Sequence, residues 1–369
     1  MMQWVDVLEK IITNIIPEIA KPTADFVFTI SQNLINSLET DEEKALFVPK
    51  ILPLMKTAQF VFEGGILPKN RIYSFKEIIY HIKKIQDDPV ESICDNFIHF
   101  IKATEIKNYF LSLNEDEQEK EIVEIINFLK EYGFHVYPYE SLQKYNHADI
   151  EVFYDESNEN GYVLVENKRL YFPCGWKTEQ IKGSYNTLRM EQDMNSPHRY
   201  ETPDFSLREG DVIADVGAAE GIWALRNVEN ASKVFLFECD PGWCYALQKT
   251  FEPWKEKVII VNKYVSNIVD YKNTTMDEIF RGQRIDFIKA DIEGFESKML
   301  IGSKEILKNN NNLNLLLCTY HGKDDAANFK ELLEKCGFIT EFSKGYMLCF
   351  YYHDLKEPYI RRGVIRAKK

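Results

Sequence analysis

The chain has 369 residues, enough for two domains and a sizeable hydrophobic core. Charged residues make up 28% of it and the formal net charge is -13, as in an acidic soluble protein. An acidic surface disfavours functions that depend on nucleic-acid phosphates or anionic lipids. No segment is apolar and uncharged over the roughly 18 residues that a membrane-spanning helix needs, so we predict no membrane span.

The amino-terminal segment MMQWVDVLEKII carries Asp6 and Glu9 within its apolar pattern and has no basic leader. We therefore expect no signal peptide. The seven cysteines are odd in number, scattered and free of CxxC pairs, which favours a reduced, cytoplasmic protein without structural zinc.

Residues 1–133 have apolar side chains at helical spacing, and prolines divide the segment into roughly five or six helices. The clearest helix is NEDEQEKEIVEIINFLKEYG. Asn114 is its candidate N-cap with Glu117 in the capping-box position, and Gly133 supplies a left-handed end. We expect residues 1–140 to form an all-helical accessory domain that helps to place the acceptor or to form a homo-oligomer.

The second predicted domain, residues 141–369, opens with short β-like segments at 150–154, 162–166 and 169–172. Turn-rich sequence separates them, which predicts a small β meander. The start of a helix and a polar loop follow in LRMEQDMNSPHRYETPDF. We therefore expect a meander and a lid over about residues 150–206.

Strands and helices alternate from Asp211 onward. Strands are expected at 212–216, 233–237, 258–262, 285–290 and 313–319, and helices from 220, from 241, and near 275–280, 297–308 and 324–336. This alternation predicts an α/β fold with a doubly wound, Rossmann-like, mostly parallel sheet over residues 207–369. The strand-like segments after Phe338 leave the final hairpin unassigned.

The first chemistry-bearing segment is DVGAAEG at 215–221, where a strand ends, the chain turns at Gly217 and a helix begins near Glu220. Glycine permits positive φ and lets a ligand approach the backbone N–H groups of a helix start. A dinucleotide fold uses GxGxxG to hold a pyrophosphate, but here Ala219 replaces the middle glycine. The spacing favours a cofactor without phosphates over NAD, although a glycine turn that only packs remains an alternative.

Glu238 follows the next predicted strand, about 20 residues beyond the glycine turn, where a carboxylate can accept both hydroxyls of a ribose. The alternative role is to cap the helix that starts at Pro241, but Asp240 is better placed for that. We expect Glu238→Ala or Gly217→Val to abolish cofactor binding and to leave folding intact.

The most unusual segment is IDFIKADIEGFE, in which Lys289, Asp291 and Glu293 alternate at the exit of a central strand. Side chains at i and i+2 share a face, so these charges converge at the carboxyl end of the strand. Burying a charge costs several kcal/mol unless it is paired. Pairing accounts for Lys289, whereas Asp291 is a candidate functional carboxylate.

Two flanking groups complete the predicted site. His321 ends the next strand and therefore lies near the same crevice as Asp291. The polar loop before the first strand is a candidate lid or acceptor site, although a solvated loop explains it almost as well. The predicted substrate-binding residues are Glu191, His198, Arg199, Tyr200 and His321.

Four segments, VIADVGAAEG, FLFECD, TTMDEIF and DFIKADIEGFE, together resemble the FkbM-type family of S-adenosylmethionine-dependent methyltransferases over about residues 185–340. The resemblance implies a class I methyltransferase fold and O-methylation of a hydroxyl, often on a sugar, glycan or secondary metabolite. The expected cofactor-binding residues are Asp215, Gly217, Ala218, Glu220, Gly221, Glu238 and Asp291. The catalytic candidates are His321, Asp291, Glu293 and Lys289.

The expected chemistry is direct displacement, with His321 or Asp291 as the base that removes the acceptor proton. A variant places Mg²⁺ between Asp291, Glu293 and the acceptor oxygens. Two other functions remain open: an NAD-dependent oxidoreductase, and a non-catalytic interaction protein with a methyltransferase-like body. We expect a small-molecule or glycan acceptor as the partner, and no nucleic acid.

Overall fold

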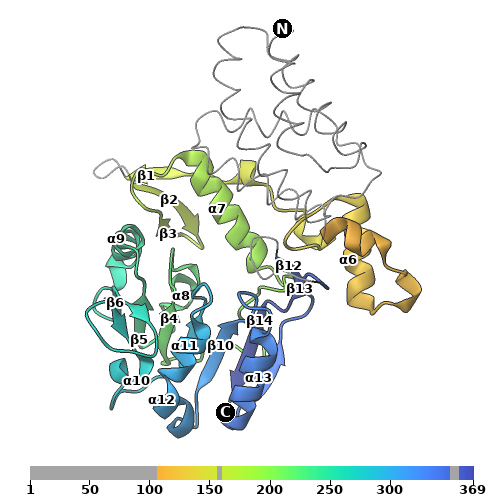
Figure 1. Cartoon of the computed structure of the whole chain (residues 1–369). Helices are drawn as coiled ribbons and strands as arrows, with labels where there is room; N and C mark the ends of the chain where they lie inside the picture. Colours follow the sequence, from red (N-terminus) through yellow and green to blue (C-terminus); the bar gives the residue numbers. More distant parts are fainter. Residues whose placement is uncertain (1–105, 156–159, 350–356) are drawn as a thin grey trace, which may run out of the picture. The chain divides into compact units, whose positions relative to one another are not determined.

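The computed structural model describes residues 106–155, 160–349 and 357–369 (Figure 1). The chain divides into two compact units, Met1–Ser112 and Leu113–Lys369. Most of the predicted helical domain, and with it the predicted route to a homo-oligomer, lies outside the described residues. The elements from Glu115 onward all belong to the second unit.

The second unit opens with a 3-10 turn, η1 (Glu115–Glu117), and the helix α6 (Lys120–Glu131). Asn114 caps the 3-10 turn by accepting a hydrogen bond from the backbone N–H of Asp116, at 3.4 Å. Asn114 therefore caps a separate 3-10 turn and not the predicted helix, because the chain becomes extended at Gln118 and α6 begins only at Lys120 with Glu119 as its N-cap. The predicted left-handed end is confirmed by Gly133, whose φ is +83°.

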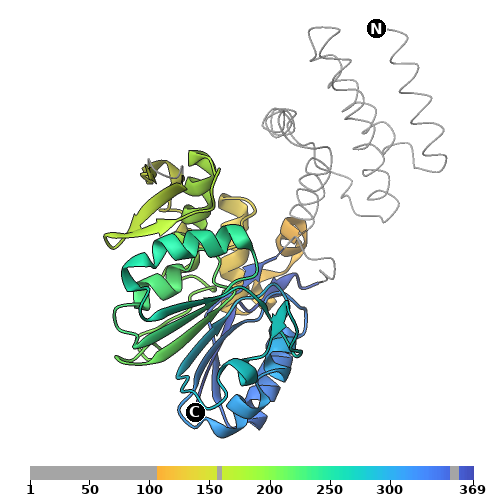
Figure 2. The same cartoon turned by 90° about the vertical axis from the view of Figure 1, so that its left-hand side faces the viewer.

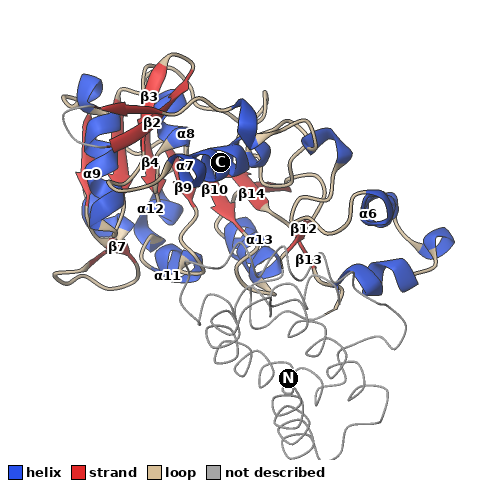
Figure 3. Ribbon diagram, turned by 90° about the horizontal axis from the view of Figure 1, so that it is seen from above, coloured by secondary structure: helices blue, strands red, loops and turns tan. Residues whose placement is uncertain are grey.

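A three-stranded antiparallel sheet confirms the predicted meander. Its strands are β1 (Phe153–Asp155), β2 (Asn160–Val165) and β3 (Lys168–Tyr171), after the 3-10 turns η2 (Glu140–Leu142) and η3 (His147–Asp149). Glu166 and Asn167 both have positive φ, as a two-residue turn between twisted strands requires. Figure 3 shows β2 and β3 close to the helices that follow the first strands of the main sheet.

The helix α7 (Thr178–Glu191) follows the meander. The sequence pattern predicted only the start of a helix near Leu188, whereas the helix begins at Thr178 and ends at Glu191. Only Ile181 and Met190 of this helix are buried. With so few buried positions, no apolar stripe marked its full length.

The main sheet has seven strands in the order β11-β14-β10-β9-β4-β5-β6. Its strands are β4 (Val212–Val216), β5 (Lys233–Phe237), β6 (Val258–Val261), β9 (Phe287–Ala290), β10 (Asn314–Cys318), β11 (Ile339–Phe342) and β14 (Val364–Lys368). All neighbours are parallel except β14, which is antiparallel to both β10 and β11. The mixed sheet with its covering helices confirms the predicted α/β fold with a mostly parallel sheet.

Helices cover both faces of this sheet, as Figure 2 shows. One hydrophobic cluster joins the meander and α7 to the face under α8 (Ile222–Asn227) and α9 (Pro241–Thr250). The other joins the opposite face to α11 (Glu296–Ile301), α12 (Lys304–Asn309) and α13 (Asp325–Lys335). Because both faces of the sheet are buried, the sequences of the parallel strands are continuously apolar.

The remaining elements are α10 (Met276–Ile279), η4 (Glu252–Trp254), and the pairs β7 (Tyr264–Val265) with β8 (Asn273–Thr274) and β12 (Met347–Leu348) with β13 (Ile360–Arg361).

The order of the strands indicates where a ligand would bind. Along the chain the parallel strands run outward from β4 through β5 to β6, and the chain then returns to the other side of β4 for β9 and β10. Ligands of doubly wound sheets bind outside the carboxyl ends of the strands at this reversal. By this rule a ligand would bind over the carboxyl ends of β4 and β9. Within the described residues, no helix combines the length and the apolar character that crossing a membrane requires.

Candidate active site

The glycine turn after β4 lies directly against the exit of β9. Gly217 has a φ of +72° and Ala219 one of +45°. A Cβ on Gly217 would lie 1.9 Å from the backbone oxygen of Asp291 and 2.9 Å from Cγ2 of Ile292. Glycine is thus required both by the backbone conformation and by the close approach of the second strand.

Glu238, after β5, holds this turn in shape. Its Oε2 accepts a hydrogen bond from the backbone N–H of Ala219 at 2.9 Å, and its Oε1 accepts one from the backbone N–H of Asp240 at 2.8 Å. Asp240 is the N-cap of α9 and accepts from the backbone N–H of Trp243, which confirms the predicted choice of cap. Each oxygen of an ionised carboxylate has a second acceptor position, so Glu238 retains capacity for hydroxyl donors.

Lys289 and Asp215 form a buried ion pair between the two central strands. The Lys289 ammonium lies 2.8 Å from Oδ1 of Asp215 and donates to the backbone oxygen of Gly217 at 2.9 Å. Burial alone would lower the pKa of Lys289, but Asp215 and Asp291 together raise it. The pair fixes the glycine turn to β9, in agreement with the structural role expected for Lys289.

Asp291 is the centre of a cluster of aromatic hydroxyls and imidazoles. Tyr200 donates to its Oδ2 at 3.0 Å and Tyr320 to its Oδ1 at 3.1 Å. Nε2 of His198 lies 3.6 Å from Oδ2, and Nε2 of His321 lies 3.4 Å from Oδ1. Burial would raise the pKa of Asp291, but the hydrogen bond and charge of His198, with Lys289 and His321, hold it well below its usual range. Asp291 is therefore ionised.

Glu296, the first residue of α11, orients His321. Its Oε1 lies 2.9 Å from Nδ1 of His321 and accepts the backbone N–H of Ile292 at 2.9 Å. The Glu296 side chain is completely buried. Burial opposes protonation of His321, yet Glu296, Asp291 and Glu293 raise its pKa above the ordinary value. Glu293 itself lies 3.6 Å from Nε2 of His321, and its side chain is 85% exposed.

His198 closes the other side of the cluster. Its Nε2 lies 3.3 Å from the Tyr320 hydroxyl, and its Nδ1 lies 4.0 Å from Oε2 of Glu191. Glu191 accepts a hydrogen bond from the hydroxyl of Tyr137 at 3.0 Å, and burial raises its pKa. The imidazole of His198 therefore lies between the carboxylates of Asp291 and Glu191.

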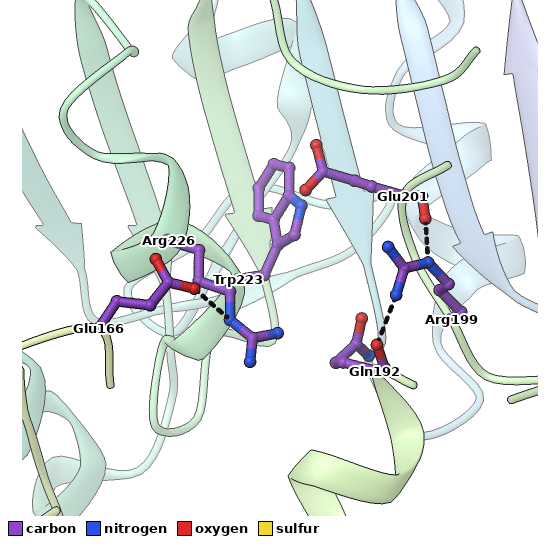
Figure 4. A pocket seen from close by; sticks show the side chains of 6 residues that line it. All are labelled: Glu166, Gln192, Arg199, Glu201, Trp223 and Arg226. Carbon is purple, nitrogen blue, oxygen red and sulfur yellow. Dashed lines mark hydrogen bonds and ion pairs between the residues drawn. The ribbon is translucent and has the colours of Figure 1, made fainter. Parts of the chain in front are cut away.

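The structure thus gathers four of the five predicted substrate-binding residues around Asp291, and Arg199 is the exception. The Arg199 guanidinium donates to the backbone oxygens of Glu201 and Gln192 and lines a separate pocket (Figure 4). Among the predicted cofactor residues, Glu220 stands out because burial raises its pKa to about 8.

The sequence pattern gave no role to Glu296, Tyr320, Cys318 or Tyr137. Glu296 ends the segment IDFIKADIEGFE and Tyr320 directly precedes His321, so their positions after strands were a usable signal. Tyr137 lies 54 residues from Glu191, so only the folded chain brings the two together. Trp223 and Trp243 pack against neighbouring aromatic rings.

Two groups of side chains in the described residues have ligand atoms within 4.8 Å of one another: His198, Asp291 and Cys318, and Asp291, Glu296 and His321. Neither contains the predicted pair of Asp291 and Glu293. Both include imidazole, and one includes a thiol, whereas Mg²⁺ prefers oxygen ligands. The donor set does not match the predicted Mg²⁺ variant.

Comparison with known proteins shows a similarity in part of the main sheet. Residues 260–340 match the family model described as the methyltransferase FkbM domain. Over this segment the chain is similar to the FkbM methyltransferase family. The resemblance predicted from the four sequence segments is thereby confirmed. No curated protein matches the chain.

Three solved structures with partial similarity are described as methyltransferases. The FkbM methyltransferase of Methylobacillus flagellatus KT is 14% identical, with a TM-score of 0.36 over 53% of this chain and 56% of its own. Our chain thus spans just over half of that relative's length. Precorrin-6y C5,15-methyltransferase of Geobacter metallireducens GS-15 is 16% identical (TM-score 0.31; 44% and 82% covered). A putative methyltransferase of Streptococcus mutans in complex with SAH is 17% identical (TM-score 0.30; 44% and 90% covered).

Proposed function

We propose that this protein is an S-adenosylmethionine-dependent methyltransferase that O-methylates a hydroxyl group of a sugar, glycan or secondary metabolite. The observation that carries the proposal is the contact between the glycine turn and the Asp291 cluster. A Cβ on Gly217 would lie 1.9 Å from the Asp291 backbone oxygen, so the proposed cofactor turn lies directly beside the polar cluster. The FkbM domain match over residues 260–340 includes Asp291 and His321.

Glu238 and the turn at Gly217 fit the cofactor. The Glu238 carboxylate is buried, points at the turn and keeps acceptor positions for the two ribose hydroxyls. Bound S-adenosylmethionine supplies an already activated methyl group. The residues of the chain therefore mainly align it with the acceptor, an effect worth roughly 7 to 11 kcal/mol of the barrier.

His321 is the base in this proposal, because Glu296 fixes the imidazole through Nδ1 and directs Nε2 toward Asp291. With cofactor and acceptor bound, Nε2 of His321 would accept the proton of the acceptor hydroxyl as that oxygen takes up the methyl group. Asp291 remains ionised and stabilises the imidazolium that forms. The low pKa of Asp291 makes it a poor proton acceptor, so of the two predicted bases we favour His321.

The same geometry disfavours the two alternatives. In an NAD-dependent oxidoreductase the backbone N–H groups of the turn bind the pyrophosphate, but the N–H of Ala219 is already bonded to Glu238. In a non-catalytic protein the buried charges around Asp291 would lower the free energy of unfolding without serving a function.

The first test is cofactor binding, measured by calorimetry for the wild type, Glu238→Gln and the control Glu209→Gln. Glu209 is an exposed carboxylate before β4. We expect Glu238→Gln to weaken S-adenosylmethionine binding about tenfold or more, because one hydrogen bond to a charged group is worth about 1.5 to 3 kcal/mol. Circular dichroism checks that both variants fold. Binding of NAD without binding of S-adenosylmethionine would contradict the proposal.

The second test is activity. The full chain is incubated with labelled S-adenosylmethionine and candidate nucleotide sugars or cell-envelope glycans, and methyl incorporation is followed. We expect alkali-stable O-methyl products and no transfer to RNA. Transfer to RNA alone would overturn the acceptor class.

A further inference from the structure

A pocket with a volume of about 330 Å³ lies on the meander side of the sheet. It lies between the turn that joins β2 to β3, the end of α7, the segment 199–201 and α8 (Figure 4). Its lining residues are Glu166, Gln192, Arg199, Glu201, Trp223 and Arg226.

This pocket is separate from the Asp291 cluster. His198 and Tyr200 reach Asp291, whereas Arg199 and Glu201, which alternate with them along the chain, line the pocket. The segment 198–201 therefore forms a wall with the proposed transfer site on one side and the pocket on the other.

Hydrogen-bond donors in the pocket lack acceptors. Trp223 is 4% exposed, and its buried indole Nε1 has no hydrogen-bond partner. Figure 4 shows this nitrogen on the side of the ring that faces Arg199 and Glu201. Nε of Arg226 is also buried without a hydrogen bond, and lies 3.6 Å from Oε1 of Glu166. Buried donors of this kind cost free energy unless a ligand or water satisfies them.

Neither carboxylate of the pocket accepts a hydrogen bond from these two donors. Glu201 already accepts hydrogen bonds from the backbone N–H of Leu207 at 3.1 Å and from Asn227 at 3.0 Å. Glu166 lies on a hairpin turn, and its side chain is 62% exposed. An anion that enters the pocket can therefore displace Glu166 from Arg226.

We propose that this pocket binds a small polar molecule through a phosphate or carboxylate group, held between Arg199 and Arg226 with the rest of the molecule near Trp223. Guanidinium groups bind both anions with charge-assisted hydrogen bonds, and the indole N–H adds a neutral donor. The volume exceeds that of the anion alone and leaves room for a sugar-sized remainder. The site requires neither S-adenosylmethionine nor methyl transfer, so it goes beyond the proposed function.

The test is calorimetry on the full chain at low ionic strength with four probes: inorganic phosphate, acetate, glucose 6-phosphate and uncharged glucose. We expect glucose 6-phosphate to bind and glucose not to bind. Inorganic phosphate and acetate distinguish the two anion chemistries. Arg226→Gln should weaken glucose 6-phosphate binding about tenfold or more, as expected for loss of a charged hydrogen-bond donor.

Glu166→Gln should strengthen glucose 6-phosphate binding, because it removes the carboxylate that competes with the ligand for Arg226. Arg189→Gln removes the same charge from α7 outside the lining and should leave the affinity unchanged. If Arg226→Gln does not fold, Arg226→Lys, which keeps the charge but loses the planar fork, should still weaken binding. Absence of binding by all three anions, or equal affinities in the wild type and both Arg226 variants, would overturn the proposal.

Discussion

The Glu296–His321 contact makes the proposed base sensitive to pH. The carboxylates around His321 raise its pKa, and a base must be unprotonated to act, so we expect kcat/KM to fall as the pH drops through this raised pKa. Glu296→Gln removes the negative charge at Nδ1, which lowers the pKa of His321. The acid limb of the pH–rate profile should then move to lower pH, while kcat falls roughly 10²- to 10⁴-fold.

The measurement is a pH series of kcat/KM for both proteins, with Glu334→Gln on the exposed part of α13 as the control. A merely structural role for Glu296 would lower activity at every pH and leave the acid limb in place. That outcome would remove His321 as the base.

Comparing Gly217 with Gly210 separates two contributions to the free energy of unfolding, the left-handed backbone and the steric clash. Its φ is +72°, and Gly210 has a similar φ of +82° with no atom within 4 Å of the point where a Cβ would lie. Left-handed backbone costs a non-glycine residue about 1 to 2 kcal/mol, which we expect for Gly210→Ala. Gly217→Ala also meets the Asp291 backbone, so it should lose roughly 3 kcal/mol or more of unfolding free energy.

Urea unfolding of both variants measures this difference. Equal losses would show that the turn and β9 relax apart freely. The contact also changes the expectation that Gly217→Val would leave folding intact: substitution here perturbs the fold, and Glu238 is the cleaner test of cofactor binding.

The proximity of residues was predictable where the fold guarantees it. Carboxyl ends of neighbouring parallel strands meet at one edge, so Asp291, His321 and Glu238 were predictable from their positions after strands. The orientation of Arg199 was not predictable, because a polar loop has no fixed periodicity. His198 and Arg199 are adjacent in sequence, yet they face different sites.

At the level of elements, agreement between sequence and structure depended on burial. β4 and β5 have the predicted bounds because continuous apolar segments end sharply at polar residues. The predicted helix over 297–308 is instead two helices, α11 and α12, with Gly302 and Ser303 between them. A Cβ on Gly302 would lie 2.2 Å from the backbone oxygen of Ser266, so a tertiary contact explains the glycine at this break.

The position of β14 shows what local sequence cannot encode. This strand enters the sheet between β10 and β11, antiparallel to both, although β10 and β14 are 46 residues apart at their register pair Cys318 and Val364. The pairing depends on long-range contacts. One is made by Arg366, which donates to the backbone oxygens of Arg199 and Tyr200 and so ties β14 to the wall of the proposed site.

On the scale of the whole molecule, the amino-terminal boundary of the second compact unit can be tested directly. The predicted boundary at residue 140 stays a prediction, while the second compact unit begins at Leu113. Tyr137 and Tyr139 belong to the hydrophobic cluster of the meander face. Glu121 on α6 accepts hydrogen bonds from the backbone N–H of Gly345 at 3.0 Å and from Arg362 at 3.1 Å.

We therefore expect residues 113–369 to unfold cooperatively and to bind S-adenosylmethionine as the full chain does. A shorter chain of residues 141–369 loses α6, Tyr137 and Tyr139, and should lose at least about 3 kcal/mol of unfolding free energy, the scale of one deleted core aromatic side chain. Urea unfolding followed by circular dichroism compares the two. Equal midpoints would favour the boundary at residue 140. A large loss confined to the shorter chain would show that the segment from α6 to Tyr139 is part of the second compact unit. The structural reason is that the Tyr137 hydroxyl donates a hydrogen bond to Glu191, which lies beside His198.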